Sequence, residues 1–182
     1  MNAPGTRSVA GGPVTANGPS HDEPADLARL QAEFTQLTHI PPNRFHPLVW
    51  IAGQPELGEG VYIGAFSVVN ANGVRIAIGD GCDIASFVAI NAADSHRRCL
   101  GLSEAIDRRD IVLEDHVFVG SHAVIKGGAH IGHHSVVAAG SVVGPGEVPP
   151  YSLVVGNPAV VKPGYYRDAV LATQPPDAST RD

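Results

Sequence analysis

The feature that most constrains the fold is a six-residue period between Leu113 and Val148. The six consecutive blocks read LEDHVF, VGSHAV, IKGGAH, IGHHSV, VAAGSV and VGPGEV. Each block opens with an aliphatic residue, and small residues recur at the fifth position. A helix with 3.6 residues per turn does not suit this period, whereas a short strand followed by a tight corner does. Because one such unit cannot bury its apolar face alone, the hexads predict a stacked solenoid.

The period also predicts which residues stack. If three strands and three corners close one triangular coil, Val119 lies against Val137 and Leu113 against Ile131, at a spacing of about 4.8 Å. The aliphatic openers then point into the prism, and the small fifth residues fit beside them at the corners. Gly120, at a second position, leaves the corner backbone free of a Cβ clash.

Length and charge limit the classes of function. The 182 residues suit one domain with a sizeable core, and the net charge of −6 argues against a nucleic-acid partner. We find no membrane-spanning apolar run and no secretory signal, so the expectation is a cytoplasmic protein without a membrane partner. The two cysteines, Cys82 and Cys99, do not form a disulfide framework, and Cys82 is interpreted as core filler at a fifth hexad position.

The flanking segments differ from the hexads in composition. Leu30, Phe34 and Leu37 share one stripe of an amphipathic helix, which is expected to cap the solenoid or to pack on a neighbouring subunit. The prolines after Gly144 end the strand pattern. The predicted organisation is a disordered tail 1–21, a helix 22–40, a β-helix 48–148 with an extruded loop 97–110, a C-terminal strand and cap 149–175, and a loose tail 176–182.

The repeat is broken once by a long insertion. An aliphatic opener is due at position 96, but the sequence supplies His96 and then RRCLGLSEAIDRRD before the hexads return. A solenoid that extrudes a loop at one corner uses that corner for something else, so His96 is the first candidate for chemistry. The alternative is an ordinary loop histidine exposed to water.

At this point the sequence resembles a known family. The stretches IASFVAINAADSH, VFVGSHAVI, IGHHSVVAAGSVV and VPPYSLVVGNPAVV are similar to the galactoside, maltose and nodulation-factor acetyltransferases of the hexapeptide-repeat group. The similarity covers roughly residues 57–162. It implies an all-β, left-handed parallel β-helix that assembles as a homotrimer with its sites between subunits.

The resemblance implies a role for His96 as the general base that deprotonates the acceptor. An imidazole suits this role because it exchanges a proton near neutral pH. Asp94 is implied to orient the imidazole or to bind the acceptor, and the alternative orienting groups are a backbone carbonyl or Glu114. Direct transfer makes Cys99 unnecessary as a nucleophile.

The resemblance also implies a groove for acetyl-coenzyme A. The GSH motif contains one matching contact, small residues let the backbone approach the pantetheine arm, and a lysine meets the nucleotide phosphates. The implied cofactor residues are Ser121, His122, Ala139, Gly140, Ser141 and Lys162. No metal is required.

The predicted activity is O-acetylation of a sugar or sugar-like small molecule. N-acetylation of an amino sugar by the same mechanism is the alternative. A zinc enzyme like the γ-class carbonic anhydrases is a remote alternative, because its ligands include two histidines five residues apart, whereas His116 and His122 are six apart. His116 and His134 are expected to stack on adjacent coils, and most histidines here are interpreted as surface residues. A scaffold without chemistry is the third class of function.

Overall fold

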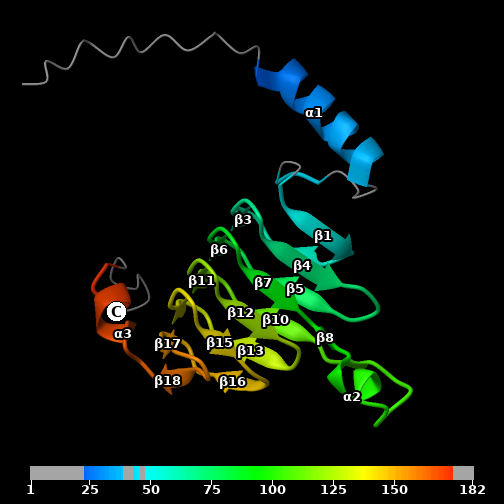
Figure 1. Cartoon of the computed structure of the whole chain (residues 1–182). Helices are drawn as coiled ribbons and strands as arrows, with labels where there is room; N and C mark the ends of the chain where they lie inside the picture. Colours follow the sequence, from blue (N-terminus) through cyan, green and yellow to red (C-terminus); the bar gives the residue numbers. More distant parts are fainter. Residues whose placement is uncertain (1–22, 39–42, 46–47, 174–182) are drawn as a thin grey trace, which may run out of the picture.

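The computed structural model describes residues 23–38, 43–45 and 48–173 (Figure 1). The tails predicted for 1–21 and 176–182 lie outside the described residues, as do positions 22, 39 and 40 at the ends of the predicted helix.

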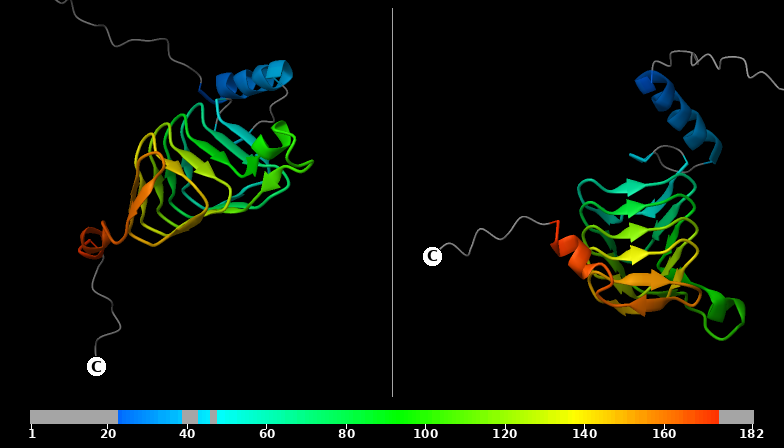
Figure 2. Two further views of the ribbon diagram at one scale, coloured as in Figure 1. Left: turned by 60° about the horizontal axis from the view of Figure 1, so that its bottom comes forward. Right: turned by 90° about the vertical axis from the view of Figure 1, so that its left-hand side faces the viewer.

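Within the described residues, three parallel sheets form the faces of a triangular prism (Figures 1 and 2). Sheet A contains β1 (Trp50–Gly53), β4 (Val68–Ala71), β7 (Ala89–Asn91), β12 (Val124–Lys126) and β15 (Val142–Val143). Sheet B contains β2 (Glu56–Leu57), β5 (Ile76–Ile78), β10 (Ile111–Leu113), β13 (Ala129–Ile131) and β16 (Gly146–Val148). Sheet C contains β3 (Tyr62–Ile63), β6 (Asp83–Ile84), β11 (Phe118–Val119), β14 (Val136–Val137) and β17 (Leu153–Val155), with β18 (Val160–Lys162) antiparallel at its edge.

The fold is the predicted left-handed parallel β-helix. In the part described, it has five coils. β1 begins the first coil in a weakly patterned hexad, and β17 completes the last coil beyond the regular repeat. β18 turns back along β17 and pairs with its outer edge, which closes this end of sheet C.

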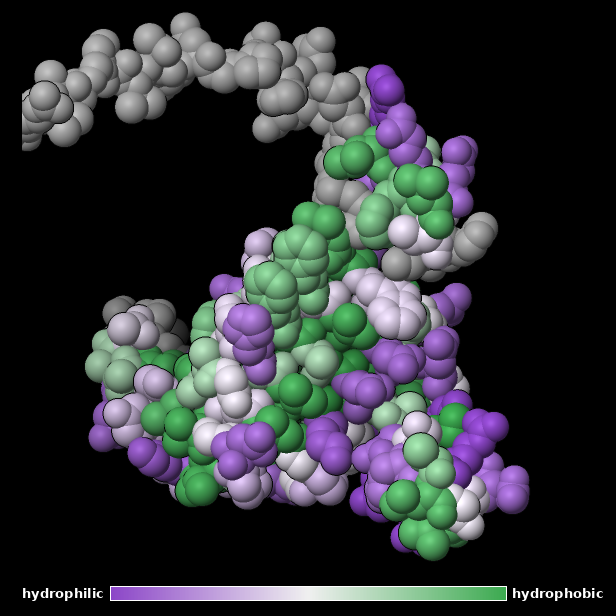
Figure 3. Space-filling model, in the orientation of Figure 1, coloured by the Kyte–Doolittle hydropathy of each residue, from purple (hydrophilic) through white to green (hydrophobic). Residues whose placement is uncertain are grey.

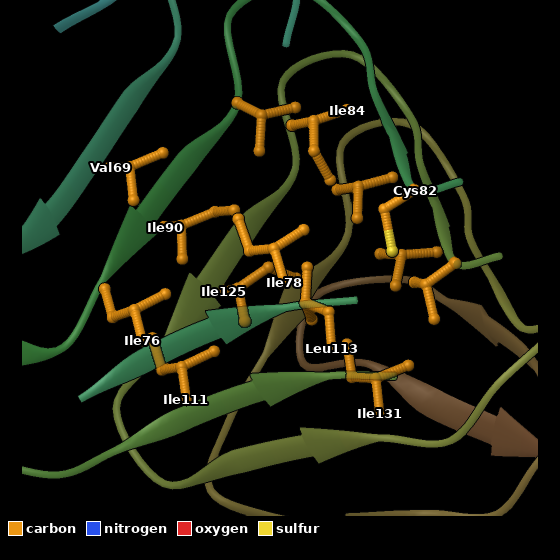
Figure 4. Close-up of a cluster of buried hydrophobic side chains, with 14 of the residues drawn as sticks. Val69, Ile76, Ile78, Cys82, Ile84, Ile90, Ile111, Leu113, Ile125 and Ile131 are labelled. Atoms are coloured by element: carbon orange, nitrogen blue, oxygen red, sulfur yellow. The ribbon is translucent and has the colours of Figure 1, made fainter. Parts of the chain in front are cut away.

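The predicted register is confirmed. Val119 pairs with Val137 and Leu113 pairs with Ile131 in neighbouring coils. The openers point into the prism, where isoleucine, leucine and valine side chains form one continuous core (Figure 4). Cys82 belongs to this core and is fully buried, as its hexad position predicted.

The small fifth residues are buried at the corners. Ser135 donates its hydroxyl hydrogen to the carbonyl oxygen of Pro149 at 3.3 Å and accepts the N–H of Ser152 at 3.0 Å. Each serine of this kind therefore links two coils while it satisfies its own polar atom. At Gly120, a Cβ would lie 2.5 Å from the backbone nitrogen of Ala139 in the next coil, which confirms why glycine stands there.

We name the three corners by the sheets that they join. Corner BC is lined by residues with positive φ, including His116, His134 and Tyr151. Corner CA carries Phe66, Phe87, His122 and Gly140 in the same left-handed conformation. At corner AB, between β7 and β10, the chain leaves the solenoid.

The extruded segment begins and ends in a short antiparallel ribbon of β8 (Ala93–Asp94) and β9 (Asp107–Arg108). Between them lies α2 (His96–Cys99), and the loop projects from the solenoid (Figures 1 and 2). Beyond α2, Leu100 and Leu102 are 68% and 63% exposed. The loop is therefore anchored at its ribbon base, and its apolar side chains are not covered by this chain.

Of the described helices, α1 and α3 lie at opposite ends of the solenoid. α1 (Glu23–Thr38) stands beyond the first coil, where Gln31 donates to the carbonyl oxygen of Asn43 at 3.4 Å (Figure 1). Leu30 and Leu37 of its apolar stripe are 49% and 83% exposed, whereas Phe34 is half-buried, so the stripe is only partly covered by the described residues. Both expectations for this helix, capping the solenoid and packing on a neighbouring subunit, stay predictions. α3 (Arg167–Leu171) follows β18.

None of the helices in the described ranges is both long enough and apolar enough to cross a membrane.

Candidate active site

His96 and Asp94 form a hydrogen-bonded pair at the base of the extruded loop. The Nδ1 atom of His96 lies 2.6 Å from Oδ1 of Asp94, and the same oxygen accepts the backbone N–H of His96 at 3.1 Å. A carboxylate accepts hydrogen bonds, so Nδ1 is the protonated ring nitrogen and Nε2 carries the free lone pair. Asp94 thereby sets the tautomer of His96 and leaves Nε2 able to accept a proton.

Hydrogen bonds stabilise the ionised form of the Asp94 carboxylate. Its side-chain hydrogen bond with His96, followed by the backbone N–H of His96, lowers the pKa of Asp94 to about 2. The Nζ atom of Lys126, on β12, adds a weaker contact at 3.4 Å from Oδ2. Asp94 is therefore ionised at neutral pH and can stabilise an imidazolium at His96.

The geometry selects among the orienting groups considered from the sequence. Glu114 does not contact His96, because its Oε1 lies 2.8 Å from Nε2 of His130 and its Oε2 accepts the N–H of His133 at 2.9 Å. Burial alone raises the pKa of Glu114, but these hydrogen bonds lower it overall. Asp94 is thus the residue that holds the His96 ring.

The ribbon explains why the pair is well positioned on a loop. β7 ends at Asn91, the chain leaves the solenoid past the buried Ala92, and the backbone N–H of Arg109 donates to the carbonyl oxygen of Ala92 at 3.1 Å. Asp94 pairs with Asp107 across the ribbon. The two ends of the extrusion are tied to each other and to the solenoid, so His96 sits next to a rigid element.

The pair borders a hollow of about 430 Å³ at corner AB. Hydrophilic side chains gather around α2 and the neighbouring solenoid surface (Figure 3). The hollow falls in the volume range of small-molecule sites. Its lining residues are Asn91, Ala92, Ala93, Asp94, Ser95, His96, Asp107, Arg109, Val124, Lys126, Gly127 and Pro145.

The predicted cofactor residues lie mainly at corner CA. The ring of His122 stacks on that of Phe87, with centroids 4.9 Å apart, and Phe87 stacks on Phe66 at 5.0 Å. The N–H of Gly140 donates to the carbonyl oxygen of Ser121 at 2.9 Å, which holds two predicted contacts together. No described heavy atom lies within 4 Å of a Cβ built on Gly140, so the backbone is accessible at this point.

Two of the predicted cofactor residues are placed differently. The side chain of Ser141 is fully buried, and its oxygen accepts the N–H of Gly156 at 3.0 Å, so its hydroxyl is part of the corner and does not face a groove. The exposed Ala139 beside Gly140 offers the accessible surface instead. Lys162 lies on β18 at the C-terminal end of the solenoid and is exposed.

One chain does not unite the two halves of the predicted site. His96 and Asp94 are at corner AB, and Ser121, His122 and Gly140 are at corner CA, at the opposite ends of the sheet A strands. The structure therefore forms each half separately, with the length of a sheet A strand between them.

Lys126, Arg109 and Asp107 were missed from the sequence. Lys126 pairs with Asn91 across sheet A although the two are far apart in the chain, because the insertion between β7 and β12 breaks the eighteen-residue spacing. Counting hexads from Asn91 after removing the inserted loop would have placed Lys126 beside the break. The charged residues of the ribbon had no comparable signal.

Three further histidines, His116, His133 and His134, form a separate group at corner BC. His116 and His134 lie 4.8 Å apart by ring centroid, which confirms the predicted stacking, and Nδ1 of His133 lies 3.0 Å from Nδ1 of His134. Burial, and then the neighbouring His116 and His133, lower the pKa of His134. Among the residues described, no three histidine, cysteine or carboxylate side chains are arranged to hold a metal ion.

The hexad region matches a known protein family model. Residues 110–145 match the family model described as bacterial transferase hexapeptide, with six repeats. The chain carries this hexapeptide repeat within residues 110–145. A comparison with curated proteins gives no match.

Solved structures share the hexapeptide solenoid. AntD, an N-acyltransferase from Bacillus cereus in complex with dTDP and 3-hydroxybutyryl-CoA, superposes with a TM-score of 0.61 at 20% identity, covering 70% of this chain and 71% of that one. An AntD variant with dTDP-4-amino-4,6-dideoxyglucose and coenzyme A gives a TM-score of 0.59 at 20% identity, covering 74% and 80%. A hexapeptide-repeat acetyltransferase from Vibrio cholerae, complexed with acetyl coenzyme A, gives 0.47 at 28% identity, covering 75% and 84%. The likeness to AntD establishes the shared fold.

Proposed function

We propose that the protein is an acetyl-coenzyme A-dependent acyltransferase that O-acetylates a sugar or sugar-like small molecule by direct transfer. The observation that carries the proposal is the His96–Asp94 pair beside a hollow, at the point where a transferase-type hexapeptide solenoid extrudes its loop. An ordinary loop histidine needs neither an ionised carboxylate at 2.6 Å nor a hollow next to its ring.

The proposed chemistry follows from the two ring nitrogens of His96. Nδ1 is held by Asp94, and Nε2 takes the proton from the acceptor hydroxyl as that oxygen attacks a carbonyl carbon. The negative charge of Asp94 then stabilises the imidazolium, and the same proton is available for the leaving thiolate. Side-chain exposure of 61% keeps His96 accessible to an acceptor in the hollow.

The corner CA surface fits the donor substrate. Acetyl-coenzyme A supplies an activated thioester, and its extended arm requires an exposed backbone lined by small side chains. Ser121, Ala139 and Gly140 offer such a surface, and the open space over Gly140 supports the assignment. Lys162 provides a cation toward the C-terminal end, where the nucleotide phosphates would lie.

A homotrimer would bring the two halves together. The His96 side chain is exposed, the loop presents Leu100 and Leu102 to solvent, and the cofactor corner lies across sheet A from them. These features support an arrangement in which the His96 loop of one copy faces corner CA of the next.

N-acetylation of an amino sugar is the second candidate. Asp94 and Asp107 both line the hollow, and two carboxylates favour an acceptor that arrives as an ammonium ion. AntD, with the same fold, is described as an N-acyltransferase. The mechanism at His96 is unchanged, because the nucleophile must still lose a proton.

The test is release of coenzyme A from acetyl-coenzyme A by metal-stripped protein, with sugars paired so that one member carries a hydroxyl where the other carries an amino group. His96→Ala is expected to lower the rate by about 10²- to 10⁴-fold, the usual contribution of general acid–base catalysis. Cys99→Ser is the matched loop control and keeps most of the activity. Release without dependence on His96 contradicts the proposed mechanism. No release from any pair, together with zinc retained by untreated protein, favours the zinc-enzyme alternative.

Mixing two inactive variants tests whether the site is shared between copies. His96→Ala damages one half, and Ala139→Trp fills the exposed cofactor corner of the other half. If copies share a site, co-refolded mixtures regain activity because some interfaces combine two intact halves. Mixtures that stay inactive while forming mixed oligomers contradict the shared site.

A further inference from the structure

The ionic side chains around the hollow are not all used by the His96 pair. Asp94, Asp107, Lys126 and Arg109 all line it. Asp94 holds His96 and lies 3.4 Å from Nζ of Lys126, a single weak contact for an ammonium with three donors. Arg109 and Asp107 are not engaged by the pair.

The guanidinium of Arg109 has no ion pair or side-chain hydrogen bond with any residue in the described ranges, and the same holds for the carboxylate of Asp107. Other arginines nearby are engaged: Arg75 binds Glu56 at 2.6 and 2.9 Å, and Nε of Arg108 donates to the carbonyl oxygen of Asn72 at 3.2 Å. Arg109 and Arg108 are sequence neighbours, yet only Arg109 lines the hollow. Successive residues of an extended segment point to opposite sides, which explains this difference.

The backbone of Arg109 is held while its side chain is free. Its N–H donates to the carbonyl oxygen of Ala92, one of the tie points at the ribbon base. Arg109 therefore lines the hollow from a fixed backbone position, together with His96. A planar guanidinium prefers a carboxylate or phosphate, which it can bind through two parallel hydrogen bonds. Lys126 lies on the same lining and adds positive charge.

We propose that Arg109, assisted by Lys126, binds an anionic group of the acceptor, a carboxylate or a phosphate, while His96 acts on a hydroxyl or amine of the same molecule. This inference rests on the proposed function and narrows its substrate class to small acidic or phosphorylated sugars. Asp107 is left to accept hydrogen bonds from the remaining hydroxyl or ammonium groups of the acceptor. A hollow of about 430 Å³ suits a monosaccharide with one such substituent.

The experiment compares glucose, glucuronate and glucose 6-phosphate as neutral, carboxylate and phosphate probes. Binding is measured by calorimetry without donor, and coenzyme A release is measured with donor. Arg109→Gln is the test variant, and Arg108→Gln is its matched control, because Arg108 carries the same charge on the same ribbon but faces away from the hollow. Unfolding curves of both variants show whether the ribbon is intact.

The expected result is that wild-type protein binds at least one anionic probe about tenfold or more tightly than glucose. Arg109→Gln should raise the dissociation constant and KM of that probe by about 10- to 100-fold. The dissociation constant of glucose for Arg109→Gln, and that of the anionic probe for Arg108→Gln, should change by less than about twofold. The anion preference should also fall as salt is raised. Comparing the two anionic probes identifies whether carboxylate or phosphate is the group recognised.

Three results would overturn the inference: glucose binding as tightly as both anions, no probe binding at all, or Arg108→Gln matching the effect of Arg109→Gln. Failure of the proposed function looks different. In that case Arg109-dependent binding of the anion persists in calorimetry, but no acceptor supports release of coenzyme A.

Discussion

Gly120 gives the sharpest test of how tightly the coils are stacked. It lies at the start of corner CA, which carries most of the predicted cofactor residues. A Cβ at this position would lie 2.5 Å from the backbone nitrogen of Ala139 and 2.9 Å from its Cα. Both are backbone atoms, which cannot rotate away as a flexible side chain would. Gly120→Ala therefore forces the two coils apart at this corner.

The size of the effect follows from these distances. Relief of the clash to an ordinary contact of about 3.4 Å needs a local shift of about 0.9 Å. The N–H of Gly120 donates to the carbonyl oxygen of Val137 at 2.8 Å, and the same shift would stretch that bond beyond hydrogen-bonding range. Overpacking costs about 1–3 kcal/mol, and a weakened hydrogen bond adds about 1 kcal/mol. We expect a loss of roughly 2–4 kcal/mol, or about 4–16 °C in Tm for a chain of this size.

The assay is urea and thermal unfolding followed by circular dichroism, with Gly144→Ala as the control. Gly144 also has no positive φ, and no described heavy atom lies within 4 Å of its Cβ position, so alanine there should change stability by less than about 0.5 kcal/mol. Equal, small losses in both variants would refute the close-stacking argument. Because Ala139 lies beside the predicted cofactor contacts, Gly120→Ala should also weaken coenzyme A binding.

Two further predictions concern titratable groups. Asp94→Asn should lower kcat with little change in the KM of either substrate. The decrease in kcat should extend across the whole neutral pH range, because a pKa of about 2 keeps Asp94 charged throughout. A change in KM alone would contradict a positioning role for Asp94. Burial, followed by the neighbouring His116 and His133, lowers the pKa of His134 in the folded protein. Between this folded pKa and the unfolded value of about 6.5, the unfolded chain binds more protons than the folded one. The free energy of unfolding should therefore fall as pH drops through that window. His134→Asn, which tolerates φ 54, should flatten this dependence in urea unfolding at about pH 7 and pH 5.5, and an unchanged slope would count against it.

Much of the solenoid was predictable because its information is local and periodic. The aliphatic openers and small fifth residues specify strands, corners and an eighteen-residue stacking, and pairs such as Val119 with Val137 follow from counting. The break in the period also singled out His96. The first and last coils were harder to predict, because β1 and β17 lie where the hexad pattern is weak or interrupted by proline.

The arrangement of the site depended on tertiary structure. The sequence left Asp94, Glu114 and a backbone carbonyl open as partners of His96, and only the ribbon between β8 and β9 brings Oδ1 of Asp94 to the ring. Ser141 fits the cofactor motif by sequence, yet its hydroxyl points into a corner.

The sequence by itself determined the period, the core and the place where the chain leaves the solenoid, since these depend on residues close together or at fixed intervals. Only the tertiary structure decided that Lys126 and Arg109 share a hollow with His96, and that the cofactor corner lies across sheet A. The physical reason is that an inserted loop has no period. Its contacts are set by where the ribbon docks on the closed coils, and such long-range geometry cannot be counted along the chain.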